Sequence, residues 1–119
     1  MNVNQKIESA LSALVDGNIW PLSCPLEALP NQWITYLPEL EAPEEFGDNE
    51  DLIWIHYMQI HWFAKGHANY MDIRKRIRLL LKSSGFTVTD IDYMYEKDTG
   101  VTHLIFSCEI EEDEPYGKM

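Results

Sequence analysis

The sequence is poor in cysteine, in positive charge and in long apolar runs, and each scarcity excludes a class of protein. Cys24 and Cys108 are the only cysteines among 119 residues, and they form no CxxC pair. This pattern indicates free thiols in a reducing compartment rather than a disulfide framework or a zinc site of familiar spacing. No apolar run approaches the roughly 18 residues that span a bilayer. The first residues lack the basic and apolar stretches of a signal peptide, so we expect a cytoplasmic protein without a membrane partner.

Recognisable catalytic motifs are also missing. There is no glycine-rich phosphate loop, no GxSxG, no HExxH and no cysteine close to a histidine in sequence. The segment IWIHYMQIHWFAKGH, residues 53–67, holds three of the four histidines and is the best candidate for a metal site. His56 and His61 are five positions apart, however, and a strand would direct them to opposite faces. His67 and His103 complete no ligand set of known spacing, so we expect no metal, no cofactor and no catalytic residues.

Positive charge is segregated as well as scarce. Nine Lys and Arg stand against 20 Asp and Glu, which gives a net charge of −11. Such a chain repels the phosphates of nucleic acids over most of its surface, so we expect no sequence-specific nucleic acid binding. Six of the nine cations fall within residues 65–82, whereas seven acids fall within 39–51 and five within 109–114. These charges either form solvated faces or provide a basic stripe that meets the acidic segment of another copy.

Helical periodicity is present in two segments. Apolar residues recur on one stripe over 3–15, and Gly17 is placed to end this helix in a left-handed conformation. A second stripe predicts a helix over 70–83 that Asn69 or His67 could cap and that Gly85 ends. Tyr70, Ile73, Ile77, Leu80 and Leu81 would form its inner face. Lys75, Arg78, Leu79 and Lys82 would lie on the outer face.

Strand signals occupy most of the remainder. Residues 33–37 and 52–63 are rich in β-branched and aromatic side chains, and both faces of the second segment are largely apolar, as in a central strand. A hairpin is predicted from 86 to 112, turning at KDTG. Its second arm directs Leu104, Phe106, Cys108 and Ile110 to the core and His103 outward, where truncation of His103 should cost little. In the first arm, a change of apolar parity predicts a bulge near Thr89 or Asp90.

The predicted fold class is α+β, with an antiparallel sheet of about four strands and two helices packed on one face. We expect a single domain over residues 1–119. Residues 38–51 are acidic and interrupted by Pro38, Pro43 and Gly47, which predicts an exposed mobile loop. Residues 113–119 should form a frayed tail.

The order of these elements resembles that of a known family. ESALSALVDGNIWPL and ALPNQWITYL precede a long strand, a helix, GF and a hairpin turning at DTG. Over roughly residues 5–112, this order is similar to that of the small tail-completion proteins of long-tailed phages and prophages, the tail terminator or head-to-tail joining proteins. The matching points are Gly17, Trp20-Pro21, Leu29-Pro30 and Asp98-Thr99-Gly100. The acidic insertion 38–51 and the unusually aromatic central strand depart from the family pattern.

The resemblance implies a structural protein without catalytic residues. Such proteins form rings, commonly hexameric, at the head-proximal end of the tail, where they terminate the tail tube and dock to the head connector. The partners would be further copies of the chain, the tail tube protein and a head connector or head-closure protein. The protein would reside in the host cytoplasm during assembly and then at the tail–head junction of the virion.

The segregated charges suggest how copies or partners could meet. As a hypothesis, the outer face of helix 70–83 contacts acidic surface on an adjacent subunit or on a tail partner. The residues assigned to this interface are Lys75, Arg78, Leu79, Lys82, Glu44, Glu45, Asp48, Glu50 and Asp51. Two other classes remain open: an acidic adaptor or inhibitor that binds a basic protein, and a small metal-dependent enzyme that uses His56, His61, His67 or His103.

Overall fold

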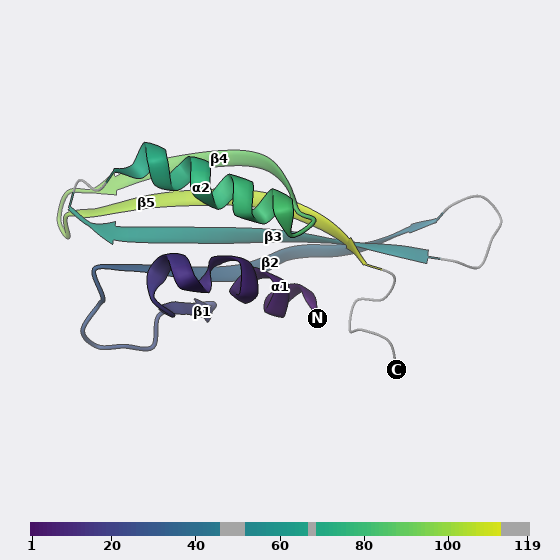
Figure 1. Cartoon of the computed structure of the whole chain (residues 1–119), viewed down its shortest axis with the longest axis horizontal. Helices are drawn as coiled ribbons and strands as arrows, with labels where there is room; N and C mark the ends of the chain where they lie inside the picture. Colours follow the sequence, from purple (N-terminus) through teal and green to yellow (C-terminus); the bar gives the residue numbers. More distant parts are fainter. Residues whose placement is uncertain (46–51, 67–68, 113–119) are drawn as a thin grey trace.

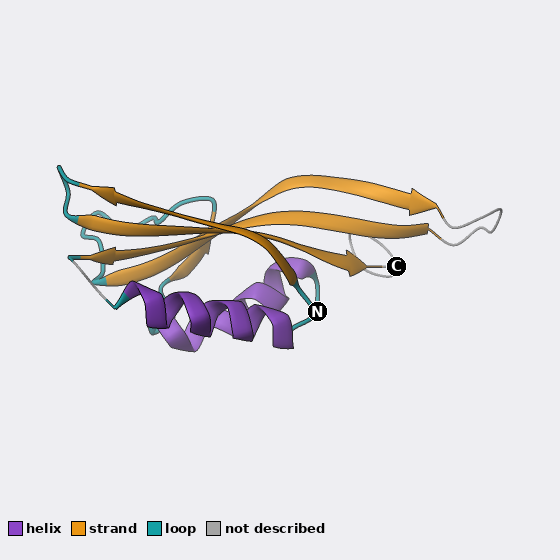
Figure 2. Cartoon of the chain, turned by 90° about the horizontal axis from the view of Figure 1, so that it is seen from above, coloured by secondary structure: helices purple, strands orange, loops and turns teal. Residues whose placement is uncertain are grey.

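The computed structural model describes residues 1–45, 52–66 and 69–112, which fold into one sheet with two helices against one face (Figures 1 and 2). The strand order is β1-β2-β3-β5-β4, antiparallel throughout except that β1 runs parallel to β2. The elements in chain order are α1 (Val3–Leu11), η1 (Ser12–Val15), β1 (Ile19–Pro21), β2 (Gln32–Glu45), β3 (Leu52–Lys65), α2 (Tyr70–Ser83), β4 (Thr87–Glu96) and β5 (Val101–Glu112). The α+β prediction is confirmed, with β1 as a fifth strand.

Local signals at the helix ends explain where the helices begin and stop. Asn2 and Gln5 form a capping box at the start of α1, each side chain bonding the other residue's backbone N–H. The side chain of Asn69 accepts a hydrogen bond from the N–H of Asp72 at the start of α2. The helix predicted over 3–15 is α-helical only to Leu11 and continues as the 3-10 helix η1 to Val15, after which Asp16 and Gly17 are both left-handed, with φ values of +52° and +80°. Gly85 adopts a φ of +96° beyond α2, as predicted.

The prediction of a loop over residues 38–51 is wrong for its first half. Residues 38–45 continue β2, whose register against β3 shifts between Pro38 and Leu40. β1 pairs only with Ile34, Thr35 and Tyr36, so the later part of β2 has β3 as its one neighbour in the sheet. A proline is tolerated on such an edge because its missing N–H points away from the ladder. Residues 46–51 and 113–119, for which we predicted mobility and fraying, lie outside the described residues.

The core lies between the sheet and the two helices. Ile7 and Leu11 of α1, and Ile77 and Leu81 of α2, are fully buried. On β5, the alternate residues Leu104, Phe106, Cys108 and Ile110 are buried on this helix-covered face, as predicted. The predicted bulge is also confirmed, since the register of β4 against β5 shifts between Val88 and Asp90. Alternation along the strands therefore determines which residues meet the helices.

The molecule is elongated because β2 and β3 extend beyond the helices. Its principal extents are 53 × 25 × 23 Å, and the long β2–β3 pair projects past α1 and α2 at one end (Figure 2). Tyr36 ties the other part of β2 to α1, because its hydroxyl donates to Oε2 of Glu8. Burial, the hydrogen bond and the charge of Glu8 all raise the pKa of Tyr36. No helix among the described residues is long and apolar enough to cross a membrane.

Candidate interaction surfaces

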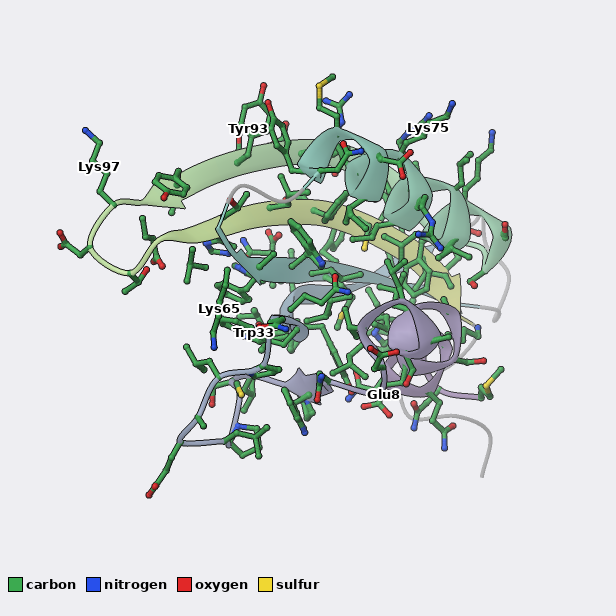
Figure 3. The ribbon with its side chains drawn as sticks, turned by 60° about the vertical axis from the view of Figure 1, so that its left-hand side comes forward. Glu8, Trp33, Lys65, Lys75, Tyr93 and Lys97 are labelled. Carbon is green, nitrogen blue, oxygen red and sulfur yellow. The ribbon has the colours of Figure 1, made fainter. Side chains whose placement is uncertain are left out.

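The basic face of α2 is exposed, as its sequence predicts. Lys75, Arg78, Leu79 and Lys82 are all exposed, and Leu79 retains 46% of its surface. Lys75 is seen on the outside of the helix in Figure 3. This face is fixed by the opposite stripe, where Ile77 and Leu81 pack into the core. The basic face is thus a supported surface on a rigid element rather than a flexible tail.

The C-terminal half of this basic face borders a hollow of about 190 Å³. Arg78 and Lys82 line it together with Phe86, Thr87 and Val88. The ring of Phe86 is buried, so the hollow combines two cationic side chains with an apolar wall. Such a combination suits a partner surface that presents a carboxylate beside an apolar side chain.

The acidic half of the predicted interface is only partly described. Glu44 and Glu45 are the last residues of β2, at the end of the projecting β2–β3 pair (Figure 1). Asp48, Glu50 and Asp51 lie outside the described residues. The end of β2 lies beyond the helices in the view of Figure 2, so a single copy does not bring Glu45 alongside the basic face.

The sheet face opposite the helices carries an aromatic row that the sequence did not reveal. Trp33, Phe63 and His103 are register neighbours on β2, β3 and β5. The ring centroids of Trp33 and Phe63 are 4.9 Å apart, and those of Phe63 and His103 are 4.2 Å apart. His103 was expected to be an outward residue of little consequence. It does lie on the outer face, but this stacking leaves it only 8% exposed.

Two histidines meet on this face. Nδ1 of His61 lies 2.7 Å from Nε2 of His103, and Nε2 of His61 lies 3.1 Å from Oε1 of Gln59. Since the amide oxygen of Gln59 only accepts, Nε2 of His61 carries a proton, and in the neutral ring Nδ1 then accepts from Nε2–H of His103. Nδ1 of His103 is then a bare lone pair, and it is buried without a hydrogen-bond partner. A proton on this nitrogen would be buried without an acceptor, so the arrangement favours two neutral imidazoles.

Electrostatics agree with this protonation. Burial lowers the pKa of His61 below its usual 6.5. Burial, assisted by the neighbouring His61 and opposed by Glu96, lowers the pKa of His103 to about 4. A further proton on the pair, beyond the one that each neutral ring carries, would place a charge in a half-closed site beside another imidazole.

The histidine pair predicts that stability falls at mildly acidic pH. A histidine whose pKa is lower in the folded state binds its proton more readily when unfolded, so its stabilising contribution is fully present above pH 6.5 and is lost as pH falls toward 4. The melting temperature of the wild-type protein should therefore fall further between about pH 7.5 and about pH 5 than the melting temperature of His103→Gln does. The glutamine keeps a donor to His61. An equal loss in both proteins would contradict the neutral pair.

The structure separates the other histidines from this pair. His56 is buried on the helix-covered face and His61 lies on the opposite face, so the predicted divergence of the two is confirmed. His67 lies outside the described residues. Among the residues that are described, no three His, Cys, Asp or Glu side chains are grouped as metal ligands would be. The contact of His61 with His103 could be foreseen only from the β3–β5 register, which no local sequence pattern supplies.

A cluster of exposed aromatic side chains was also missed. Tyr70 was predicted on the inner stripe of α2, but 40% of it is exposed and its ring centroid lies 6.0 Å from that of Tyr93. Met71, Met94 and Tyr95 are exposed as well. The signal lay in YMY at residues 93–95, an apolar triplet at the end of a strand whose edge position the sequence did not determine.

Comparison with known proteins places the fold but no family. No model of a known protein family matches the sequence, and no curated protein matches it. Among solved structures, one chain of a structure titled "Virion of native gene transfer agent (GTA) particle" is similar to the whole molecule. The two superpose with a TM-score of 0.62, covering 92% of this chain and 90% of that chain at 11% sequence identity. The chain thus shares its fold with a component of that virion.

Proposed function

We propose that this protein is a structural component of a phage-like particle. In this proposal it forms a ring at the head-proximal end of the tail, where it terminates the tail tube and joins it to the head connector. The observation that carries the proposal is the fold shared over 92% of the chain with a chain of a gene transfer agent virion. The resemblance of the element order to tail-completion proteins, found in the sequence alone, supports the same role independently.

The distribution of charge supports assembly into a ring. A head-to-tail ring requires two different surfaces on each copy, because each subunit presents one surface to each neighbour. The exposed basic face of α2 is one such surface, and the acidic segment that begins in β2 is the other. Across such an interface the charges would set register and encounter rate more than affinity, while Leu79 would add buried apolar area.

The described titratable groups support a structural role over a catalytic one. Burial, with smaller contributions from Glu39 and Glu109, raises the pKa of the Cys108 thiol to about 12, which makes it unreactive at neutral pH. A hollow of about 350 Å³ near Gly85 is lined by Lys6, Glu109 and Glu111 among others, without a cysteine or histidine. The projecting β2–β3 pair instead offers a long surface for contacts along the particle axis.

The proposal predicts a defect in particle assembly when the gene is removed. A phage or prophage that lacks the protein should produce filled heads and separate tails, and a plasmid copy of the gene should restore joined particles. Electron microscopy with antibody labelling should place the protein at the tail–head junction. Normal particles from the deleted strain would contradict the proposal. Binding of the protein to a basic host protein, in place of labelling at the junction, would favour an adaptor.

A further inference from the structure

Exposed large apolar side chains gather at the two opposite edges of the sheet. Eight of the eleven that the structure describes belong to two groups. The tyrosine edge, on β4 and the start of α2, comprises Tyr70, Met71, Tyr93 and Tyr95 on the helix side of the sheet and Met94 on the opposite side of β4. The leucine loop, which follows β1, comprises Leu22, Leu26 and Leu29. Since β1 and β4 are the outermost strands, one group flanks each edge of the sheet.

The tyrosine edge has the composition of a protein interface. Its central residue, Tyr93, is 60% exposed and lies next to Tyr70 of α2. Tyrosine and methionine are enriched at interfaces. Tyrosine provides contact area with little loss of side-chain entropy, and methionine adapts its shape to the partner. The first half of β4 is protected from edge pairing by its bulge and by Asp90 and Asp92. The last half, with Tyr93, Met94 and Tyr95, lacks an equivalent device.

The leucine loop is held in place although its side chains are exposed. Leu22, 69% exposed, has a φ of +71°, a conformation that non-glycine residues rarely adopt. Its backbone N–H donates to the carbonyl of Tyr36 over 2.9 Å. Farther along, the ammonium of Lys65 donates to the carbonyl of Leu29 over 2.7 Å. Strain and exposure together indicate a surface kept in one shape for a partner, which lowers the entropic cost of binding.

The two surfaces lie at the same end of the long axis. In Figure 1 the turn between β4 and β5, the start of α2 and the loop after β1 are all at the left-hand end. Figure 3 shows Tyr93 on one side of this end and Trp33 and Lys65 on the other. Two different surfaces at the same position along the long axis can meet when neighbouring copies stand side by side. Repetition of this contact without a shift along the axis closes a ring instead of forming a helical filament.

We propose that the tyrosine edge of one copy binds the leucine loop of the next. This inference rests on the proposed ring and adds a second contact between its subunits, separate from the charged surfaces. The charges beside the two surfaces are also complementary. Glu96 follows Tyr95 at the tyrosine edge, and the exposed ammonium of Lys65 is hydrogen-bonded to Leu29 of the leucine loop. A second copy is the occupant that supplies both surfaces in a single contact, so neither patch remains exposed in the ring.

Cross-linking between variants that each carry one introduced cysteine tests this contact. Leu26→Cys and Tyr93→Cys are each made in a Cys24→Ser background, because Cys24 lies in the leucine loop; Cys108 is buried. The two variants, carrying different tags, are co-expressed, purified both free and in particles, and treated with a mild thiol oxidant. A disulfide-linked dimer that contains both tags is expected. Each variant expressed alone should give no linked dimer, because different surfaces meet.

Controls separate this contact from other modes of assembly. Leu40→Cys, an exposed leucine outside both surfaces, should give no linked dimer with Tyr93→Cys. Linked dimers from either variant alone would overturn the proposal, because they would show a surface meeting itself. Joined particles without any mixed-tag dimer would overturn this contact while leaving the role in tail completion intact. Normal particles from the deleted strain, together with unlinked monomers of the cysteine variants, would contradict both proposals.

Discussion

Phe106→Ala is expected to lower the free energy of unfolding by about 3–5 kcal/mol. Phe106 is fully buried in the middle of β5, where it is register neighbour to Ile60 of β3 and Ile91 of β4. Truncation removes the favourable transfer free energy of the ring and leaves a cavity. Because β5 is hydrogen-bonded to a strand on each side, the sheet cannot collapse to fill this cavity. Chemical denaturation of the purified wild type and variant measures this loss of unfolding free energy, when both are fitted with one common dependence of free energy on denaturant concentration.

An exposed leucine provides the matched control. Leu40→Ala on β2 removes an apolar side chain that is 58% exposed, so its effect should stay within about 0.5 kcal/mol. If the protein is oligomeric, both variants should be compared at one concentration, since association adds to apparent stability. Equal effects of the two substitutions would show that the inward and outward faces of the sheet are wrongly assigned.

Simultaneous replacement of Lys75, Arg78 and Lys82 by glutamate is expected to abolish tail completion while leaving the chain folded. The three side chains are exposed and the helix is held by its opposite face, so the core is not altered. The reversal turns attraction to an acidic partner into repulsion along the whole face. Single reversals should have much smaller effects, because one exposed ion pair is worth about 0–1 kcal/mol. Complementation of a deleted phage or prophage, together with sedimentation and circular dichroism, gives the readout.

Three further variants resolve the origin of such a defect. Replacing the same residues by glutamine should give an intermediate loss, since attraction is removed without adding repulsion. Lys97→Glu, on the turn between β4 and β5, should complement normally (Figure 3). Adding Glu44→Lys and Glu45→Lys to the triple variant should restore assembly if the acidic partner is another copy. Full complementation by the triple glutamate variant would show that the basic face is only solvated.

The two proposed contacts use different parts of each copy and can coexist. The tyrosine edge and the leucine loop lie at one end of the long axis, whereas β2 carries Glu44 and Glu45 to the other end (Figure 1). The first contact would join neighbours side by side. The acidic end of β2 projects past the helices, so it is better placed to reach a subunit or tail partner displaced along the long axis. The variant that adds Glu44→Lys and Glu45→Lys to the triple glutamate variant tests this second contact.

Local sequence determined the features that depend on neighbouring residues. The limits of α2 follow from Asn69 and Gly85, and the alternation in β5 identifies Phe106 as buried without knowledge of its partners. The bulge near Asp90 was equally visible as a change of parity along one strand. Capping, left-handed termination and alternation act over one to four residues, so they can be read before the chain is folded.

Tertiary structure alone decided what depends on position in the sheet. Acidic residues with Pro38, Pro43 and Gly47 predicted a loop in the sequence, yet β2 passes through both prolines because β1 is too short to cover that edge. His61 and His103 are 42 residues apart and meet only through the register of β3 with β5. The exposure of Tyr93 likewise follows from β4 being the last strand of the sheet. Strand order and register are set by pairing between distant segments, which composition and periodicity do not encode.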